Sequence, residues 1–144
     1  MKLNIQKPQS LNLPVKLLHL LNTETVKQGT SMASVNAVTF NFRDDDYSAD
    51  TGGYHPVEIR IEKVDRTQND EQWQFIYMTD FSYQGAPFPE LVKEIDICFV
   101  SKRVHSLYGG YLNHSQGQQL LTVFISNFIE YHSMGAYHVT IICD

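Results

Sequence analysis

Strand-like segments follow one another through the middle of the chain, with no helical segment between them. Hydrophobic and polar residues alternate in Val35–Phe42 and again in Pro56–Val64, which is the pattern of a strand with one buried face. The segment Trp73–Tyr83 is longer and more aromatic, and Ile95–Val100 is a shorter apolar run. Because consecutive strands joined by turns pair side by side, this series predicts a largely antiparallel sheet.

One helix is predicted on each side of this series of strands. A leucine-rich segment follows Pro14 and ends at Gly29. A last strand is expected over Tyr137–Cys143. The predicted order is therefore α-β-β-β-β-α-β, an α+β fold in which two helices pack on one face of a largely antiparallel sheet. The second helix, Gln118–His132, carries one broad apolar stripe made of Leu120, Leu121, Phe124, Ile125, Phe128 and Ile129.

The third strand is expected to supply much of the core. Regular alternation would place on one face the side chains of Trp73, Phe75, Tyr77, Thr79, Phe81 and Tyr83. We expect these aromatic residues to pack beneath the second helix, and the alternative is that they line a ligand pocket between sheet and helix. Turns are predicted over residues 65–71 and over Pro89–Glu94, whereas Ser101–Gln116 has no clear pattern.

Size, charge and cysteine content narrow the class of protein. A chain of 144 residues can bury one core, so a single domain over residues 1–144 is expected. The net charge is −5, and most acidic residues lie between positions 44 and 96, which argues against nucleic-acid binding. The sequence has no apolar stretch of the length that a membrane span needs and no visible signal peptide. Cys98 and Cys143 lie in apolar runs and are predicted to be buried thiols of a cytoplasmic protein.

Three segments carry a resemblance to a known family. They are NFRDDDYSADTGGYHPVEI (Asn41–Ile59), YMTDFSYQGAPFPELVKEID (Tyr77–Asp96) and MGAYHV (Met134–Val139). Together they resemble a small bacterial family of unknown function whose members are associated with mobile elements. The resemblance implies a compact α+β domain, and it implies no activity, cofactor or catalytic residue. The sequence departs from the family pattern mainly around Ser101–Gln119.

The segment between the first two predicted strands is the first candidate binding site. It is much longer than an ordinary hairpin loop, and such loops in compact domains are usually functional or disordered. Its tyrosines predict an ordered loop that presents its aspartates and its histidine at the surface as a recognition site. A solvated loop and a cation site are the alternatives, although the spacing does not match a calcium loop. The candidate residues are Arg43, Asp44, Asp45, Asp46, Tyr47, Tyr54 and His55, and Arg43 is expected to hold the loop through the aspartates.

A second candidate surface lies in the stretch without a clear pattern. Tyr108 and Tyr111 flank two glycines, and such a segment can stack on a flat ligand or a peptide. The alternative is an ordinary surface connection. The nearby His105 and His114 lack the spacing of a zinc motif, so the sequence predicts no metal site and no cofactor.

Catalytic and phosphate-binding motifs are absent from the sequence, including the Gly-x-Ser-x-Gly elbow and the Walker A loop. The leading hypothesis is therefore a non-enzymatic module that binds a protein or a small molecule, accessory to mobile-element biology, with its oligomeric state left open. The alternative is a small hydrolase or isomerase whose acid–base site uses Asp80, His55 or Asp44–Asp46. A cleft holding a carboxylate and a histidine within hydrogen-bond reach would favour that alternative. Asp80 and Asp96 are themselves expected on a solvated face or at a strand end.

Overall fold

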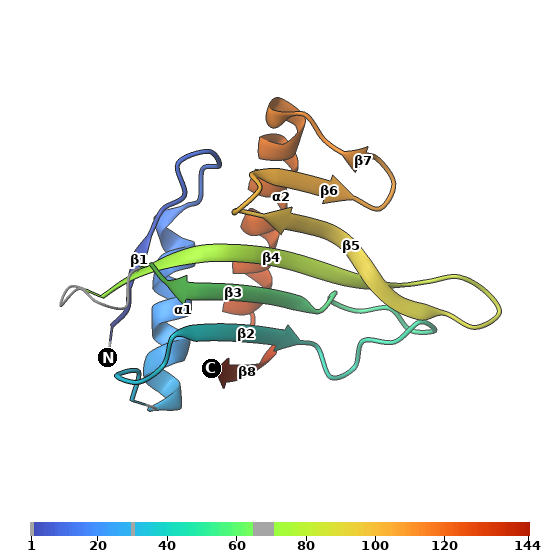
Figure 1. Ribbon diagram of the computed structural model, residues 1–144. Helices are drawn as coiled ribbons and strands as arrows, with labels where there is room; N and C mark the ends of the chain where they lie inside the picture. Colours follow the sequence, from blue (N-terminus) through green and yellow to red (C-terminus); the bar gives the residue numbers. More distant parts are fainter. Residues whose placement is uncertain (1, 30, 65–70) are drawn as a thin grey trace.

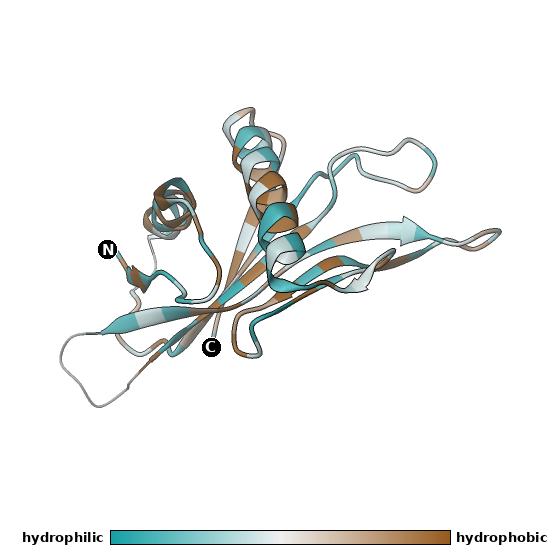
Figure 2. Ribbon diagram, turned by 90° about the horizontal axis from the view of Figure 1, so that it is seen from above, coloured by the Kyte–Doolittle hydropathy of each residue, from teal (hydrophilic) through white to brown (hydrophobic). Residues whose placement is uncertain are grey.

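The computed structural model describes residues 2–29, 31–64 and 71–144, and these form one large sheet with two helices on one of its faces (Figures 1 and 2). The helices are α1 (Val15–Gln28) and α2 (His114–Ser133). The strands are β1 (Asn4–Gln6), β2 (Ala37–Arg43), β3 (Val57–Lys63), β4 (Gln72–Gln84), β5 (Glu90–Cys98), β6 (Arg103–Ser106), β7 (Gly110–Tyr111) and β8 (His138–Cys143). The predicted α+β class and its largely antiparallel sheet are confirmed.

The order of strands across the sheet is β7-β6-β5-β4-β3-β2-β8, and all neighbours in this series are antiparallel. The short β1 pairs in parallel with the first residues of β4, where β5 does not reach. The consecutive strands β3 and β4 pair as the predicted antiparallel sheet requires, with Glu58 opposite Thr79 and Ile61 opposite Phe75. The chain therefore builds the centre of the sheet from consecutive hairpins and completes one side of it with its last strand.

The main core lies between the sheet and the helices. Each central strand sends alternate apolar side chains to this face because one side of the sheet is covered and the other is open. Phe42 of β2 meets Phe128 of α2 edge-on, with ring centroids 4.8 Å apart. At the end of α2, His132 Nε2 lies 2.8 Å from Oε1 of the buried Glu24, which joins the two helices. The largest fully buried side chains include Trp73, Phe40, Phe42, Phe128, Leu17, Leu21 and Met32.

The ends of both helices follow local sequence signals. Gly29 ends α1 in the left-handed conformation that glycine favours, with φ 67°, as predicted. The helix α2 begins four residues before the predicted Gln118, because Asn113 and Gln116 form a capping box at its start. This polar first turn has no apolar stripe, so periodicity alone missed it. Gly117 in the same turn is buried and brings the helix close to Val104 of β6.

The prediction that side chains alternate regularly between the two faces of β4 was wrong. The pairing of β3 with β4 shifts between Arg60 and Ile61, which leaves Ile76 as an extra residue in β4. A one-residue bulge moves the side chains that follow it to the opposite face of the strand. Trp73 and Phe75 are therefore buried in the core, but beyond the bulge the next core residue is Met78 and not Tyr77. The predicted face of Trp73, Phe75, Tyr77, Thr79, Phe81 and Tyr83 is therefore divided, and the hydroxyl of Tyr77 instead donates a hydrogen bond to Glu58.

Other corrections concern exposed parts of the sheet. From Glu90 onward, the segment predicted as a turn over Pro89–Glu94 is the first part of β5, which is mostly exposed because the β4–β5 hairpin extends beyond α2 (Figure 1). The stretch Ser101–Gln116 contains β6, β7 and the start of α2. Cys98 is half-buried and Cys143 is exposed, so the prediction of two buried thiols was wrong. The turn predicted over residues 65–71 lies, apart from Glu71, outside the described residues.

Candidate functional site

The segment between β2 and β3 is an ordered loop held by its own backbone and by Asp44. Ser48 and Gly52 form an isolated β-bridge, and the amide of Tyr47 donates to the carbonyl of Asp44. Both carboxylate oxygens of Asp44 accept backbone hydrogen bonds, Oδ1 from Asp46 and Oδ2 from Tyr54, each at 3.0 Å. Asp44 thus shapes the loop, since its oxygens bond the backbone of that same loop.

Two tyrosines tie this loop to the rest of the fold. The ring of Tyr47 stacks on Tyr83 of β4 at 5.3 Å, and its hydroxyl accepts a hydrogen bond from the backbone amide of Tyr83. The ring of Tyr54 packs against Tyr131 of α2 at 4.6 Å and against Tyr137 beside β8 at 6.4 Å. The loop therefore closes over the ends of the strands and reaches the last turns of α2.

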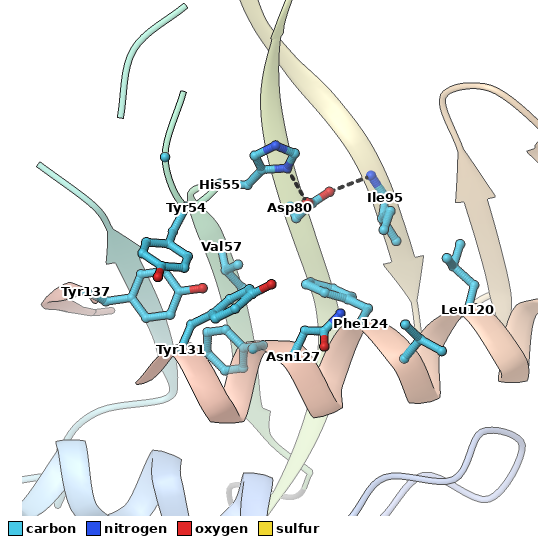
Figure 3. Close-up of a pocket in the computed structure, with 13 residues that line it drawn as sticks. Tyr54, His55, Val57, Asp80, Ile95, Leu120, Phe124, Asn127, Tyr131 and Tyr137 are labelled. Carbon is cyan, nitrogen blue, oxygen red and sulfur yellow. Dashed lines mark hydrogen bonds and ion pairs between the residues drawn. The ribbon is translucent and has the colours of Figure 1, made fainter. Parts of the chain in front are cut away.

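A pocket lies where the loop, the sheet and α2 meet (Figure 3). Its volume is about 360 Å³, within the range of small-molecule sites. The helix contributes one wall and the sheet contributes the other. The lining residues are Gly53, Tyr54, His55, Val57, Asp80, Ile95, Leu120, Val123, Phe124, Asn127, Phe128, Tyr131 and Tyr137.

A histidine and two carboxylates converge at the sheet side of this pocket. Nδ1 of His55 lies 2.9 Å from Oδ2 of Asp80 and 3.7 Å from Oε2 of Glu94. The other oxygen of Asp80, Oδ1, accepts a hydrogen bond of 2.9 Å from the backbone amide of Ile95 (Figure 3). The hydrogen bond to Asp80 raises the pKa of His55, although partial burial opposes this. His55 is therefore held in one orientation and favoured in its protonated form.

A β-bulge brings Glu94 to this position. Asp80 pairs with Ile95, but the next residue of β4, Phe81, pairs with Lys93, so Glu94 is left as the extra residue of β5. Bulges re-aim side chains in this way and are frequent beside functional sites. Ser82 then fixes Glu94, because its hydroxyl donates to Oε1 at 3.0 Å.

The opposite side of the pocket is aromatic. Tyr54, Tyr131 and Tyr137 form a contiguous group of rings, and Phe124 continues the wall along α2. Burial strongly raises the pKa of Tyr137, and the neighbouring Tyr131 and Asp80 add to this effect. Its phenol therefore stays neutral and can donate a hydrogen bond at any physiological pH.

The structure places the predicted site residues in four different environments. Tyr54 and His55 line the pocket, whereas Tyr47 and Asp44 support the loop. Arg43, Asp45 and Asp46 are exposed, and Asp45 lies 3.5 Å from the exposed His138. Tyr108 and Tyr111 lie away from the pocket: Tyr108 accepts a hydrogen bond from Gln84, and Arg103 stacks on the ring of Tyr111.

Three expectations about these residues need correction. Asp80 is only 5% exposed and faces His55, so the expectation of a solvated face was wrong. His55 is bonded to that buried carboxylate and is not a free surface contact. Within the described part of the chain, Arg43 makes no ion pair with the loop aspartates, because Asp44 bonds the backbone instead.

Sequence reasoning missed the pocket residues that come from other elements. Asn127 lies three residues after Phe124, and Tyr131 lies four residues after Asn127, so both extend the predicted helix stripe, which was an available signal. Tyr137 begins the predicted last strand, but nothing local shows that it meets Tyr54. Glu94 carried no signal, since its orientation depends on the bulge.

The architecture and the pocket define an α+β protein with a ligand-sized cavity between its sheet and a helix. The chain belongs to a family described as proteins of unknown function, DUF2787, whose profile matches residues 15–142. This confirms the resemblance noted in the sequence. No curated protein matches the chain.

Two solved structures from Vibrio cholerae are similar over nearly their full lengths. A hypothetical protein from the VSP-II pathogenicity island is 32% identical, with a TM-score of 0.88, and the match covers 99% of this chain and 100% of that one. A conserved hypothetical protein from the island VPI-2 is 28% identical, with a TM-score of 0.77 and coverage of 96% and 99%. The second is described as sharing structural homology with the human P32 protein.

In the part of the chain that the structure describes, neither helix combines the length and the apolar character needed to cross a membrane.

Proposed function

We propose that this protein binds a small organic molecule with a flat, largely apolar part in the pocket between α2 and the sheet. The pocket itself is the observation that carries this proposal: a concave, aromatic-walled cavity with a few convergent polar groups is the usual form of a small-molecule site. A protein partner is less favoured there, since interfaces between proteins are usually broad surfaces and this pocket has the size of a small-molecule site.

The lining of the pocket supports a particular class of ligand. Its volume of about 360 Å³ exceeds the cavity of roughly 150 Å³ that accommodates benzene, so one or two rings fit. The rings of Tyr54, Tyr131 and Phe124 offer stacking surfaces for the flat part. His55 and Asp80 at the sheet side would contact a polar substituent. The Vibrio relatives are encoded on pathogenicity islands, which supports an accessory role in a mobile element.

Binding can be tested with simple aromatic probes. Indole and 4-methylphenol are titrated into isotope-labelled protein in the presence of a chelator, and the amide chemical shifts are followed by NMR. We expect the largest shifts at α2 and at the loop before β3. The variant Tyr131→Ala removes part of the wall and should weaken binding, whereas Tyr108→Ala removes an exposed tyrosine outside the pocket and should leave it unchanged. Absence of binding, or equal binding by Tyr131→Ala, contradicts the proposal.

An acid–base enzyme is the second candidate function. The specific observation in its favour is the hydrogen bond of 2.9 Å between His55 and Asp80 in the pocket wall. In such a site Asp80 would orient the imidazole. A panel of chromogenic esters and phosphate esters tests this: turnover by the wild type that is lost in Asp80→Asn supports it, and activity unaffected by that change contradicts it.

A further inference from the structure

We propose that His55, Asp80 and Glu94 together bind a divalent transition-metal ion, with Zn²⁺ and Mn²⁺ the best matches to their chemistry. The proposal does not depend on the organic ligand, because it concerns the side chains at the sheet side of the pocket alone. The three residues come from the loop before β3, from β4 and from β5, which explains why no spacing along the sequence indicates a metal motif.

The distances among the three ligand atoms suit a single ion. Nδ1 of His55, Oδ2 of Asp80 and Oε2 of Glu94 all lie within 4.8 Å of one another. Metal bonds to imidazole nitrogen and carboxylate oxygen are about 2.0–2.2 Å long, so two ligands of one ion are roughly 3–3.5 Å apart. The observed separations of 2.9 and 3.7 Å from Nδ1 therefore require little movement to surround an ion.

Hydrogen bonds to the second oxygen of each carboxylate orient Asp80 and Glu94 toward His55. Oδ1 of Asp80 is occupied by the amide of Ile95, and Oε1 of Glu94 is occupied by the hydroxyl of Ser82. One oxygen of each carboxylate thus remains directed at His55. Such supporting hydrogen bonds are a regular feature of metal sites, where they fix the orientation of the ligands.

The charge of the cluster also favours a cation. Two carboxylates face one imidazole, so the cluster is negative even when His55 is protonated. Asp80 and Glu94 have side chains only 8% and 20% exposed, and water therefore screens this charge incompletely. Among the described residues, no lysine or arginine forms an ion pair with either carboxylate. A divalent ion bound to neutral imidazole would bring the total to zero.

The nature of the ligand atoms selects the metal. One nitrogen and two carboxylate oxygens, with no thiolate, suit Zn²⁺ or Mn²⁺ better than Cu⁺ or the larger Ca²⁺. The loop aspartates, considered above as a cation site, are poorer candidates. Asp44 has both oxygens committed to backbone amides, and Asp45 and Asp46 are exposed.

Calorimetric titration of the chelator-treated protein with Zn²⁺, and separately with Mn²⁺, tests the site. We expect one ion per chain, and affinity at least about tenfold weaker in Asp80→Asn and in Glu94→Gln, which keep the shape of each side chain. The matched control is Asp96→Asn, two residues from Glu94 on β5, whose carboxylate instead accepts a hydrogen bond from Thr79. A second control, His138→Ala, removes the exposed histidine beside Asp45.

The imidazole nitrogens provide a readout that does not depend on the variants. In the nitrogen NMR spectrum of the wild type, Zn²⁺ should shift Nδ1 of His55 in particular. The proposal is overturned if neither ion binds, if Asp80→Asn and Glu94→Gln bind as the wild type does, or if His138→Ala alone removes the binding. Because the aromatic probes are titrated with chelator present, failure of the metal site leaves the test of the organic ligand unaffected.

Discussion

The packing of α2 on the sheet is tested by replacing Phe128 with alanine. Phe128 is 1% exposed, and its ring meets Phe42 edge-on at 4.8 Å and lies 5.5 Å from the ring of Tyr137. Burial of a phenylalanine side chain contributes about 1.5–3 kcal/mol, and an edge-on aromatic pair contributes about 0.5–1.5 kcal/mol more. With the cavity left behind, the expected loss in the free energy of unfolding is about 3–5 kcal/mol.

The assay is urea denaturation followed by circular dichroism, together with a thermal melt. For a domain of this size the loss corresponds to a fall of roughly 10–15 °C in melting temperature. Phe124→Ala is the matched comparison, because it makes the same change one turn earlier at a half-buried position and should cost clearly less. Val123→Ala, at a side chain 59% exposed, should change stability by no more than about 0.5 kcal/mol. Equal losses at Phe128 and Phe124, or an unchanged melt for Phe128→Ala, would refute this account of the core.

Three further variants probe the loop, the open face of the sheet and the helix start. Gly53→Ala should lower the free energy of unfolding by about 1–3 kcal/mol, since Gly53 has φ 131° and a Cβ there would lie 2.7 Å from Oδ2 of Asp44. An unchanged midpoint of urea denaturation would show that the loop accommodates the Cβ without strain. Burial and the hydrogen bond to Glu58 raise the pKa of Tyr77 to about 12, so its contribution to stability is complete below pH 10 and is lost as the pH rises from 10 to 12. In pH titrations of stability Tyr77→Phe should lose less over that interval, and identical slopes would contradict the assignment. Asn113→Ala removes the capping box and should lower stability by about 1 kcal/mol, and an unaltered melting temperature would count against it.

The central strands and both helices were predictable because their patterns depend on local burial. Val57, Ile59 and Ile61 alternate with polar residues, since β3 has one covered face and one open face. The prediction failed where one extra residue, Ile76, exchanges the faces of β4. It also failed in the first part of β5, where no residue is fully buried and Leu91 is exposed, so burial imposes no apolar alternation on the sequence.

The candidate site was predictable only in fragments. His55 and Asp80 each appeared as acid–base candidates, but only the pairing of β3 with β4 brings them together. Glu94 depends on a bulge, and the contact of Tyr54 with Tyr137 joins residues far apart in the chain. Periodicity reports whether a residue faces the core, and it does not report which distant residue it meets.

The place of β8 in the sheet has a consequence for the order of folding. The backbone hydrogen-bonding groups of β2 are paired on one side by β3 and on the other by β8. During synthesis β8 is made long after β3. Until then β2 is an edge strand, and its apolar residues Phe40 and Phe42 lack part of their cover. Contacts of such high sequence separation raise the contact order and slow folding. We expect a chain in which β2 has paired with β3 but not yet with β8 to expose one unpaired, apolar sheet edge, at which chaperone binding or self-association competes with the pairing of β8.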